Sequence, residues 1–101
     1  MSHIVKPSRI RDPKALERAR ALPCVACGAR PPSDPHHVTS RGAGGHDEDA
    51  NLMPLCRKHH GMIETKGVLR MVEIFPSVYH WLAKNGRIDV YEKAMERRNI
   101  V

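Results

Sequence analysis

The sequence predicts a small α+β domain that depends on bound metal for its stability. The chain has 101 residues and only 4% aromatic side chains, so the material for a large core is limited. Chains of this size often use a structural metal to compensate for a thin core. Two short β-type segments lie near the middle of the chain, and helical patterns stand on both sides of them. Cysteines and histidine pairs are interspersed with these segments at spacings typical of metal ligands.

The positive charge of the chain indicates which kind of binding partner to expect. The formal net charge is +6 and the isoelectric point is near 9.7, which favours a polyanion over a neutral ligand, although solvation alone also explains many basic surfaces. No apolar run is long enough to cross a bilayer and no signal peptide is recognisable, so we expect a cytoplasmic protein that does not act on membranes. Three cysteines cannot all form disulfides, which favours metal ligands or free thiols.

The N-terminal half is expected to contain one helix and one strand. Residues 1–11 are polar and basic and are predicted to form a flexible arm. Asp12 and Pro13 predict a helix that begins there and runs to about Leu22. After a proline-rich loop, residues 36–40 predict a short strand.

The C-terminal half begins with a glycine-rich loop and continues mostly as helix. Residues 51–56 predict a second strand, which Pro54 restricts to a short or edge position. A helix is expected from Arg57 to about Thr65, with Gly67 ending it. Residues 68–101 predict further helices, the last of them capped by Asp89.

The motif Cys24-Val25-Ala26-Cys27-Gly28 predicts a zinc knuckle. The glycine lets the backbone turn so that both sulfur atoms face one point. The alternative is a redox-active pair of cysteines, which expects a thioredoxin-like βαβ setting that this sequence lacks. Cys56 offers a third ligand, and the second motif, Cys56-x-x-His59, repeats the spacing of the first.

Helix geometry separates the two histidines that follow Cys56. Adjacent helical residues point about 100° apart, so His59 and His60 cannot both face the same ion. We assign His59 to the Cys3His zinc site and His60 to a second face. Glu64 lies four residues beyond His60 on that face and can share a second metal with it. The alternative is that Glu64 only pairs with Lys66 or Arg57.

His36 and His37 are neighbours in a predicted strand, where successive side chains point to opposite faces. They can therefore have separate functions. One can ligate the second metal, and the other can stay metal-free and accept a proton near neutral pH.

These residues, in the blocks CVACG, HHVTSRGAGG and NLMPLCRKHH with Gly67 beyond, resemble the HNH endonucleases of the ββα-metal (His-Me finger) superfamily, particularly small phage and prophage types. The resemblance covers residues 24–67, the expected zinc and catalytic core of a single nuclease domain. It implies a β-hairpin plus helix around a catalytic ion, with flanking helices and a structural zinc. The location that it implies is the cytoplasm of a bacterium or of a phage-infected host cell.

The resemblance also implies roles for individual residues. His37 corresponds to the general base and His60 to a ligand of the catalytic ion. His36 stands where many members carry an aspartate ligand, and Glu64 stands where close relatives often carry a histidine. Asn51 corresponds to the central asparagine, whose side chain is expected to bridge backbone across the loop and hold the base in place.

We therefore expect a metal-dependent DNA endonuclease with Mg²⁺ or Mn²⁺ held by His36, His60 and Glu64. Its products would carry 5′-phosphate and 3′-hydroxyl ends, as the resemblance implies. Arg41, Arg57 and Lys58, beside the histidines, are the candidates for phosphate contacts, with surface solvation as the alternative. A second hypothesis is a zinc-stabilised DNA-binding module that cuts nothing, and a third is a nuclease that acts on RNA.

Overall fold

Two short strands, β1 (Asp34–His37) and β2 (Leu52–Leu55), form an antiparallel pair at the centre of the computed structural model, which describes residues 10–99. His36 lies opposite Met53, and His37 lies opposite Leu52. The pair contains a proline in each strand, Pro35 opposite Pro54, and the carbonyl of Pro54 accepts a hydrogen bond from outside the pair. Proline has no N–H, so neither residue can donate a hydrogen bond to the ladder at this position.

The predicted first strand, residues 36–40, is shifted in the structure. It begins two residues earlier, at Asp34, and ends at His37. The early end has an identifiable reason: the Thr39 N–H donates to the side-chain Oδ1 of Asn51 at 2.8 Å, where a continuing strand would use a backbone carbonyl. The second strand lies within its predicted range.

Helix α1 (Pro13–Arg20) begins as predicted, with the Asp12 carboxylate accepting from the Lys14 N–H at 3.0 Å. The predicted end at about Leu22 is wrong, because the helix stops at Arg20 and Leu22 is half exposed. Ser33 explains the early end: its N–H donates to the Arg20 carbonyl and its hydroxyl donates to the Leu22 carbonyl.

Helix α2 (Arg57–Ile74) is interrupted at Gly67, where the backbone has φ 85° and ψ 167°, so the predicted break is confirmed. Helix α3 (Pro76–Lys84) ends before Asn85 and Gly86, as expected. Helix α4 (Ile88–Asn99) starts one residue before Asp89. The predicted capping role of Asp89 is therefore wrong, and its carboxylate instead pairs with Arg87 at 3.2 Å.

The core lies between the strands and helices α2 and α3. Its buried members are mostly aliphatic and sulfur-containing side chains: Cys24, Met53, Leu55, Ile63, Met71, Val78 and Leu82. The aromatic side chains Phe75, Trp81 and Tyr91 pack against it from partly buried positions. A second, smaller cluster joins α1 to β2 through Ala15, Ala19 and Leu52.

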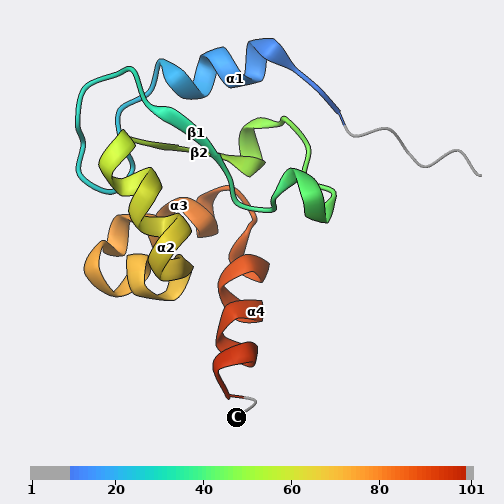
Figure 1. Ribbon diagram of the computed structural model, residues 1–101, viewed down its shortest axis with the longest axis vertical. Helices are drawn as coiled ribbons and strands as arrows, with labels where there is room; N and C mark the ends of the chain where they lie inside the picture. Colours follow the sequence, from blue (N-terminus) through green and yellow to red (C-terminus); the bar gives the residue numbers. More distant parts are fainter. Residues whose placement is uncertain (1–9, 100–101) are drawn as a thin grey trace, which may run out of the picture.

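Figure 1 shows the resulting arrangement: α1 crosses one side of the strand pair, α2 and α3 lie on the other side, and α4 leads away from them. The chain is thus a small α+β structure with a two-stranded antiparallel pair and four helices, as predicted at that level. None of the helices in residues 10–99 has the length and apolar character needed to cross a membrane. The predicted flexible arm falls mostly on residues 1–9, outside the described part. Ile10 itself is held, since its N–H donates to His46 Nδ1 at 2.8 Å.

Candidate metal centre and catalytic cleft

Cys24, Cys27, Cys56 and His59 converge as predicted, with their ligand atoms all within 4.8 Å of one another. The Cys27 and Cys56 sulfurs lie 3.9 Å apart, and His59 Nδ1 lies 3.1 Å from the Cys56 sulfur. A tetrahedral zinc with bonds of about 2.3 Å to sulfur separates its sulfur ligands by about 3.8 Å. The four side chains could therefore hold one metal ion, and their chemistry and spacing fit zinc.

The local sequence explains how the first two cysteines reach this point. Gly28 has φ 75° and donates its N–H to the Cys24 carbonyl at 2.8 Å, which closes a turn around Cys27. A left-handed backbone of this kind is costly for any residue with a side chain. The Val25 N–H donates to the Pro54 carbonyl at 2.9 Å and ties the turn to β2. The motif therefore faces the start of α2.

The fourth ligand is fixed by packing. His59 is buried, and its ring contacts Phe75 edge-to-face with centroids 4.7 Å apart. Burial opposes ionisation of the Cys24 thiol, but backbone N–H groups of Cys56, Cys27 and Ala26 outweigh it and hold the pKa of that thiol below its ordinary value. Thiolate is the form that binds metal, so the surroundings of Cys24 favour ligation by this residue.

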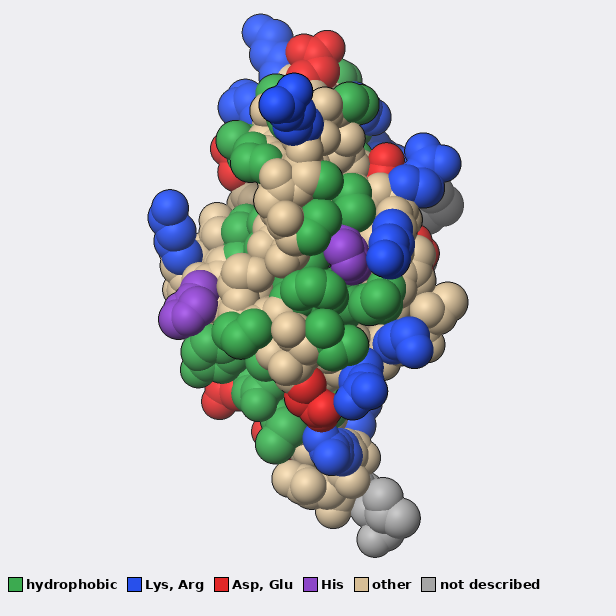
Figure 2. All heavy atoms as spheres, turned by 90° about the vertical axis from the view of Figure 1, so that its left-hand side faces the viewer, with side chains coloured by type: hydrophobic (Ala, Val, Ile, Leu, Met, Phe, Trp, Pro, Cys, Tyr) green, Lys and Arg blue, Asp and Glu red, His purple; other side chains and the backbone are tan. Residues whose placement is uncertain are grey.

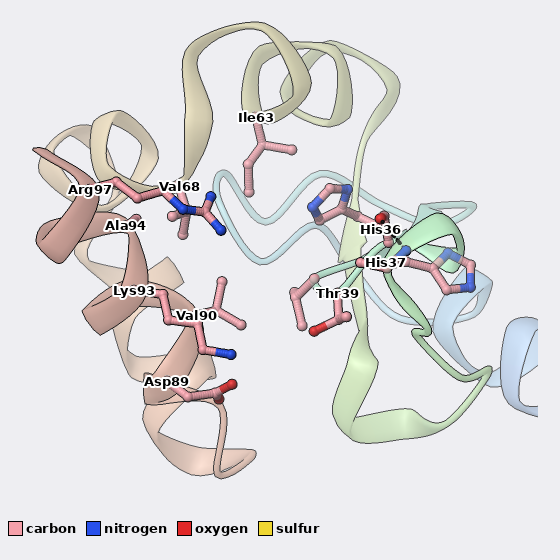
Figure 3. Close-up of a pocket in the computed structure, with 13 residues that line it drawn as sticks. His36, His37, Thr39, Ile63, Val68, Asp89, Val90, Lys93, Ala94 and Arg97 are labelled. Carbon is pink, nitrogen blue, oxygen red and sulfur yellow. Dashed lines mark hydrogen bonds between the residues drawn. The ribbon is translucent and has the colours of Figure 1, made fainter. Parts of the chain in front are cut away.

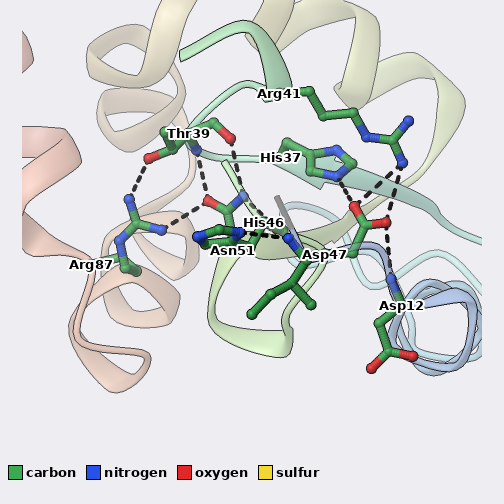
Figure 4. A network of polar contacts seen from close by, with 9 residues as sticks. Asp12, His37, Thr39, Arg41, His46, Asp47, Asn51 and Arg87 are labelled. Carbon is green, nitrogen blue, oxygen red and sulfur yellow. Dashed lines mark hydrogen bonds and ion pairs between the residues drawn. The ribbon is translucent and has the colours of Figure 1, made fainter. Parts of the chain in front are cut away.

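The second histidine of β1, His37, is bonded to a carboxylate that the sequence analysis did not single out. Its Nε2 lies 2.7 Å from Oδ1 of Asp47, whose side chain is only 3% exposed. Arg41 approaches the same carboxylate at 3.3 Å, and the Asp12 N–H donates to its other oxygen. Chiefly the bond to His37, with help from Asp12 and Arg41, holds the pKa of Asp47 below its ordinary value. Asp47 is thus a fixed anion behind His37 (Figure 4).

His60, on the first turn of α2, lies between two carboxylates. Its Nδ1 is 3.1 Å from Oδ2 of Asp34, and its Nε2 is 3.1 Å from Oε1 of Glu64. His60 and Glu64 therefore lie on the same face of α2, as predicted. Arg57, one of the two alternative partners named for Glu64, pairs with Asp34 instead, at 2.9 Å. The bonds to His60 and Arg57, which outweigh the effect of burial, hold the pKa of Asp34 below its ordinary value.

His36 lies beside His60, with ring centroids 5.3 Å apart. Burial, with smaller contributions from the charges of His60 and His37, lowers the pKa of His36 to about 4. A neutral imidazole can ligate a metal. However, within residues 10–99 the Cys3His set is the only group of three or more His, Cys, Asp or Glu side chains placed so that they could hold one metal ion. His36, His60 and Glu64 are therefore neighbours without forming a closed ligand set.

Asn51 bridges the loop between the strands, as expected. Its Nδ2 donates to the carbonyls of Thr39 at 3.0 Å and His46 at 2.9 Å, and its Oδ1 accepts from the Thr39 N–H. The side chain is 1% exposed. Gly45 is required beside it, because a Cβ at that position would lie 1.8 Å from the Thr39 carbonyl oxygen. The bridge fixes both ends of the segment that carries Asp47 relative to β1.

Most of the histidines and carboxylates described above line one open cleft of about 720 Å³. It is lined by His37 from β1, His60 and Glu64 from α2, and Asp34 between them. Of the predicted phosphate-contact residues, Arg41 and Arg57 line the cleft and Lys58 does not, although Lys58 is exposed nearby on α2. Arg20 of α1 adds a third cation. On the face shown in Figure 2, Lys and Arg side chains are prominent along the right-hand edge, and hydrophobic side chains occupy much of the middle.

Three residues at this site were missed by sequence reasoning: Asp34, Asp47 and Arg87. Arg87 donates from Nη1 to Asn51 Oδ1 at 2.8 Å and from Nη2 to the Thr39 hydroxyl. Each of the three acts on a residue far away in the sequence, so no local spacing marks it. The only available signal was the acidic cluster that contains Asp47, close to the glycine-rich loop.

Residues 1–69 match the family described as "Protein of unknown function (DUF968)". The chain belongs to the DUF968 family. A curated relative, "Uncharacterized protein YdfU" from Escherichia coli (strain K12), is 45% identical over 52 residues, which cover 48% of this chain and 15% of the relative. This DUF968 chain therefore corresponds to a small part of that protein's length. No solved structure matches the chain.

Proposed function

We propose that this DUF968 protein is a metal-dependent DNA endonuclease that hydrolyses phosphodiester bonds, with His37 as the general base. One observation carries the proposal: His37, backed by the buried Asp47, and His60, held between Asp34 and Glu64, line the same open cleft. Phosphodiester hydrolysis requires a general base that takes a proton from water and a cation that neutralises the phosphate. His37 could act as the base, and the carboxylates beside His60 could help to hold the cation.

The contact between His37 and Asp47 determines which ring nitrogen of His37 is available to accept a proton. A carboxylate accepts the proton carried by Nε2, and this leaves the lone pair on Nδ1. Nδ1 can then take a proton from an attacking water in the cleft, while Asp47 stabilises the imidazolium that forms. Because the pKa of Asp47 is held below its ordinary value, this carboxylate is charged throughout the neutral range.

The cleft also offers donors that suit a hard divalent cation. Asp34 accepts from Nδ1–H of His60, which is the arrangement by which carboxylates orient metal-binding histidines, and Nε2 then faces Glu64. His60 and Glu64 would hold the ion. His36, the further ligand proposed from the sequence, lies beside His60 but does not line this cleft. A bound Mg²⁺ or Mn²⁺ supplies charge neutralisation at the scissile phosphate.

The metal centre and the strand order support the same proposal. Strand β2 leads into α2 through Cys56. His37 lies on β1, Asn51 on the short 3-10 turn (Asp49–Asn51) just before β2, and His60 on α2, an order that fits the ββα-metal arrangement. We also propose a structural zinc, which would fix the start of α2 against β2. Its ligands would be Cys24, Cys27, Cys56 and His59. DNA is the proposed substrate, because the chain is basic and Arg20, Arg41 and Arg57 surround the histidines.

A zinc-stabilised DNA-binding module that cuts nothing is the second candidate. One observation favours it: no second group of three close metal donors is present in residues 10–99. A pure binding module, however, has no need for a histidine backed by a buried carboxylate in the same cleft as His60.

Plasmid cleavage separates the two functions. We expect supercoiled plasmid to be nicked with Mg²⁺ or Mn²⁺, and the His37→Ala variant to lose about 10²–10⁴-fold in rate, the usual contribution of a general base. Zinc content and DNA affinity should stay near wild type, because affinity comes from phosphate neutralisation. The control is His80→Ala, which removes an exposed histidine of α3 outside the cleft. A wild-type protein that binds plasmid but leaves it intact under all metal conditions would favour the binding module.

A further inference from the structure

A second cavity, of about 480 Å³, lies on the other side of β1 from the cleft described above. It opens between β1 with its following loop and the faces of α2 and α4 (Figure 3). This volume falls within the range of about 300–1,000 Å³ that is typical of small-molecule sites. His37 contributes to both cavities, and the His36 ring points into this one. The two cavities therefore meet at the proposed catalytic strand.

The lining of this second cavity is amphipathic. Its apolar part consists mostly of aliphatic side chains from the residue that follows β1 and from α2 and α4: Val38, Ile63, Val68, Val90 and Ala94. Its polar part includes the histidines of β1 and the Thr39 and Ser40 side chains of the following loop. On the opposite side it includes Lys93 and Arg97, which are four residues apart and so lie on the same face of α4. The one carboxylate of the lining, Asp89, is paired with Arg87 at 3.2 Å.

The two cations of α4 have no direct protein partner in residues 10–99. Neither Lys93 nor Arg97 makes a hydrogen bond or ion pair there, and Lys93 interacts with Asp89 only by charge at longer range. In contrast, the arginines of the first cleft, Arg41 and Arg57, are already bound to carboxylates. The second cavity thus combines an apolar body with two available positive charges, and this combination is complementary to a nucleotide.

We propose that this cavity binds an unpaired nucleotide of the DNA strand next to the phosphate that His37 attacks. The base would lie on the aliphatic lining beside His36, and its phosphate would contact Lys93 and Arg97. This inference rests on the proposed nuclease function, and it goes further by naming the substrate class: DNA with an unpaired or extruded nucleotide. A base held inside a duplex cannot enter a cavity between α4 and β1, because its neighbours are stacked on both sides of it.

The charge requirement can be tested by binding without cleavage. Fluorescence anisotropy with a labelled single-stranded oligodeoxynucleotide would use the full chain without added divalent cation. Lys93→Ala/Arg97→Ala should weaken binding at least about tenfold and reduce the slope of log affinity against log salt by about 1.4, the value for two lost phosphate contacts. The matched control, Lys66→Ala/Lys84→Ala, removes two exposed lysines that do not line the cavity and should change affinity less than about twofold.

The base requirement is tested by filling the cavity and by removing the base. Ala94→Phe adds bulk to the α4 side of the cavity without changing charge. It should weaken binding of a short normal oligonucleotide by about tenfold, in line with the loss of one stacked base, and should scarcely affect the abasic version of that oligonucleotide. Circular dichroism and zinc content would show that each variant is folded.

The outcomes also separate this inference from the proposed function. The nucleotide site would be overturned if Lys93→Ala/Arg97→Ala and the lysine control lost equal affinity for the oligonucleotide. It would also be overturned if Ala94→Phe weakened binding of normal and abasic strands equally. Both conclusions hold even if the protein cuts plasmid. Equal weakening of duplex and single-stranded binding by Lys93→Ala/Arg97→Ala would also overturn it, because it would indicate phosphate contacts alone. If the α4 variants weaken oligonucleotide binding as expected but the wild-type protein never cuts DNA, the nucleotide site would be supported and the nuclease function rejected.

Discussion

The guanidinium of Arg87 donates to the side-chain oxygen of Asn51 over 2.8 Å, and this contact joins the C-terminal helices to the loop beside the proposed catalytic strand. A second N–H of Arg87 reaches the Thr39 hydroxyl, just after β1 ends (Figure 4). Arg87 lies between α3 and α4, beyond residues 1–69 that match the family. The part of the chain outside the family match therefore completes the polar network behind His37.

Arg87→Ala should lower both stability and the rate of cleavage. It removes two hydrogen bonds to a buried network, and each charged bond of this kind contributes about 1.5–3 kcal/mol. We expect the free energy of unfolding to fall by about 3–6 kcal/mol in urea denaturation, and the rate at saturating DNA to fall while the concentration for half-maximal cleavage stays constant. Arg87→Lys should recover part of the rate, since it keeps one donor.

The control for this experiment is Arg98→Ala, which also removes an arginine but only loses an exposed pair with Glu73. A purely structural role for Arg87 would reduce the fraction of folded enzyme, with no change in the rate per folded molecule.

Asp47→Asn should slow cleavage without a loss of zinc. The amide keeps the shape of the carboxylate but removes the charge that holds and stabilises a protonated His37, so we expect a rate loss of about 10²-fold, at the low end of the range for acid–base catalysis. Because the pKa of Asp47 is held below its ordinary value, its stabilising charge is complete at neutral pH and would be lost only as the pH falls through that lowered pKa.

Single-turnover cleavage rates at neutral pH, where the Asp47 charge is complete, would measure the effect of Asp47→Asn. Asp49→Asn serves as the control, because Asp49 is exposed and pairs with Arg18. Equal rates for wild type and Asp47→Asn would show that the bond to His37 has no catalytic importance.

Glu64 should set the preference for the catalytic metal. A carboxylate is a harder donor than imidazole, so Glu64→His should keep the fold and raise the ratio of the Ni²⁺ rate to the Mg²⁺ rate. Glu64→Ala should need more Mg²⁺ for half-maximal cleavage. The side chain is 61% exposed, so neither substitution should disturb packing.

Cleavage rate against metal concentration for the three proteins would test the role of Glu64. Glu73→Ala, another exposed glutamate of α2, provides the comparison. Superimposable curves for wild type and the Glu64 variants would remove this carboxylate from the ion site and leave His36 and His60 as the protein ligands.

One zinc ion should copurify with each chain, and Cys24→Ala or Cys56→Ala should unfold the protein instead of merely slowing it. The physical reason is that the core is thin and the cluster joins the Cys24 turn, β2 and α2, so ligation energy is also folding energy. Elemental analysis without added zinc and thermal melts before and after chelation would measure this. His80→Ala should melt like the wild type. An unchanged melting temperature after complete removal of zinc would contradict the prediction.

The sequence by itself determined the parts of this protein that depend on short-range geometry. The two C-x-x-C/H spacings and the glycine of the knuckle were enough to group Cys24, Cys27, Cys56 and His59. The 100° step between helical neighbours assigned His59 to that group and His60 to the face of Glu64. Helix starts at Asp12 and the break at Gly67 were also predictable, because capping and left-handed backbone are local effects.

Only the tertiary structure decided which groups stand behind the proposed catalytic histidines. Asp47 meets His37 across ten residues, Asp34 meets His60 across 26, and Arg87 meets Asn51 across 36. Such contacts depend on how the loop folds back onto β1 and how α3 and α4 pack, and no local periodicity encodes them. The end of β1 at His37, where Ser40 was predicted, has the same reason. The Thr39 N–H donates to the Asn51 side chain, which lies 12 residues away, and not to the backbone carbonyl that a longer strand would use.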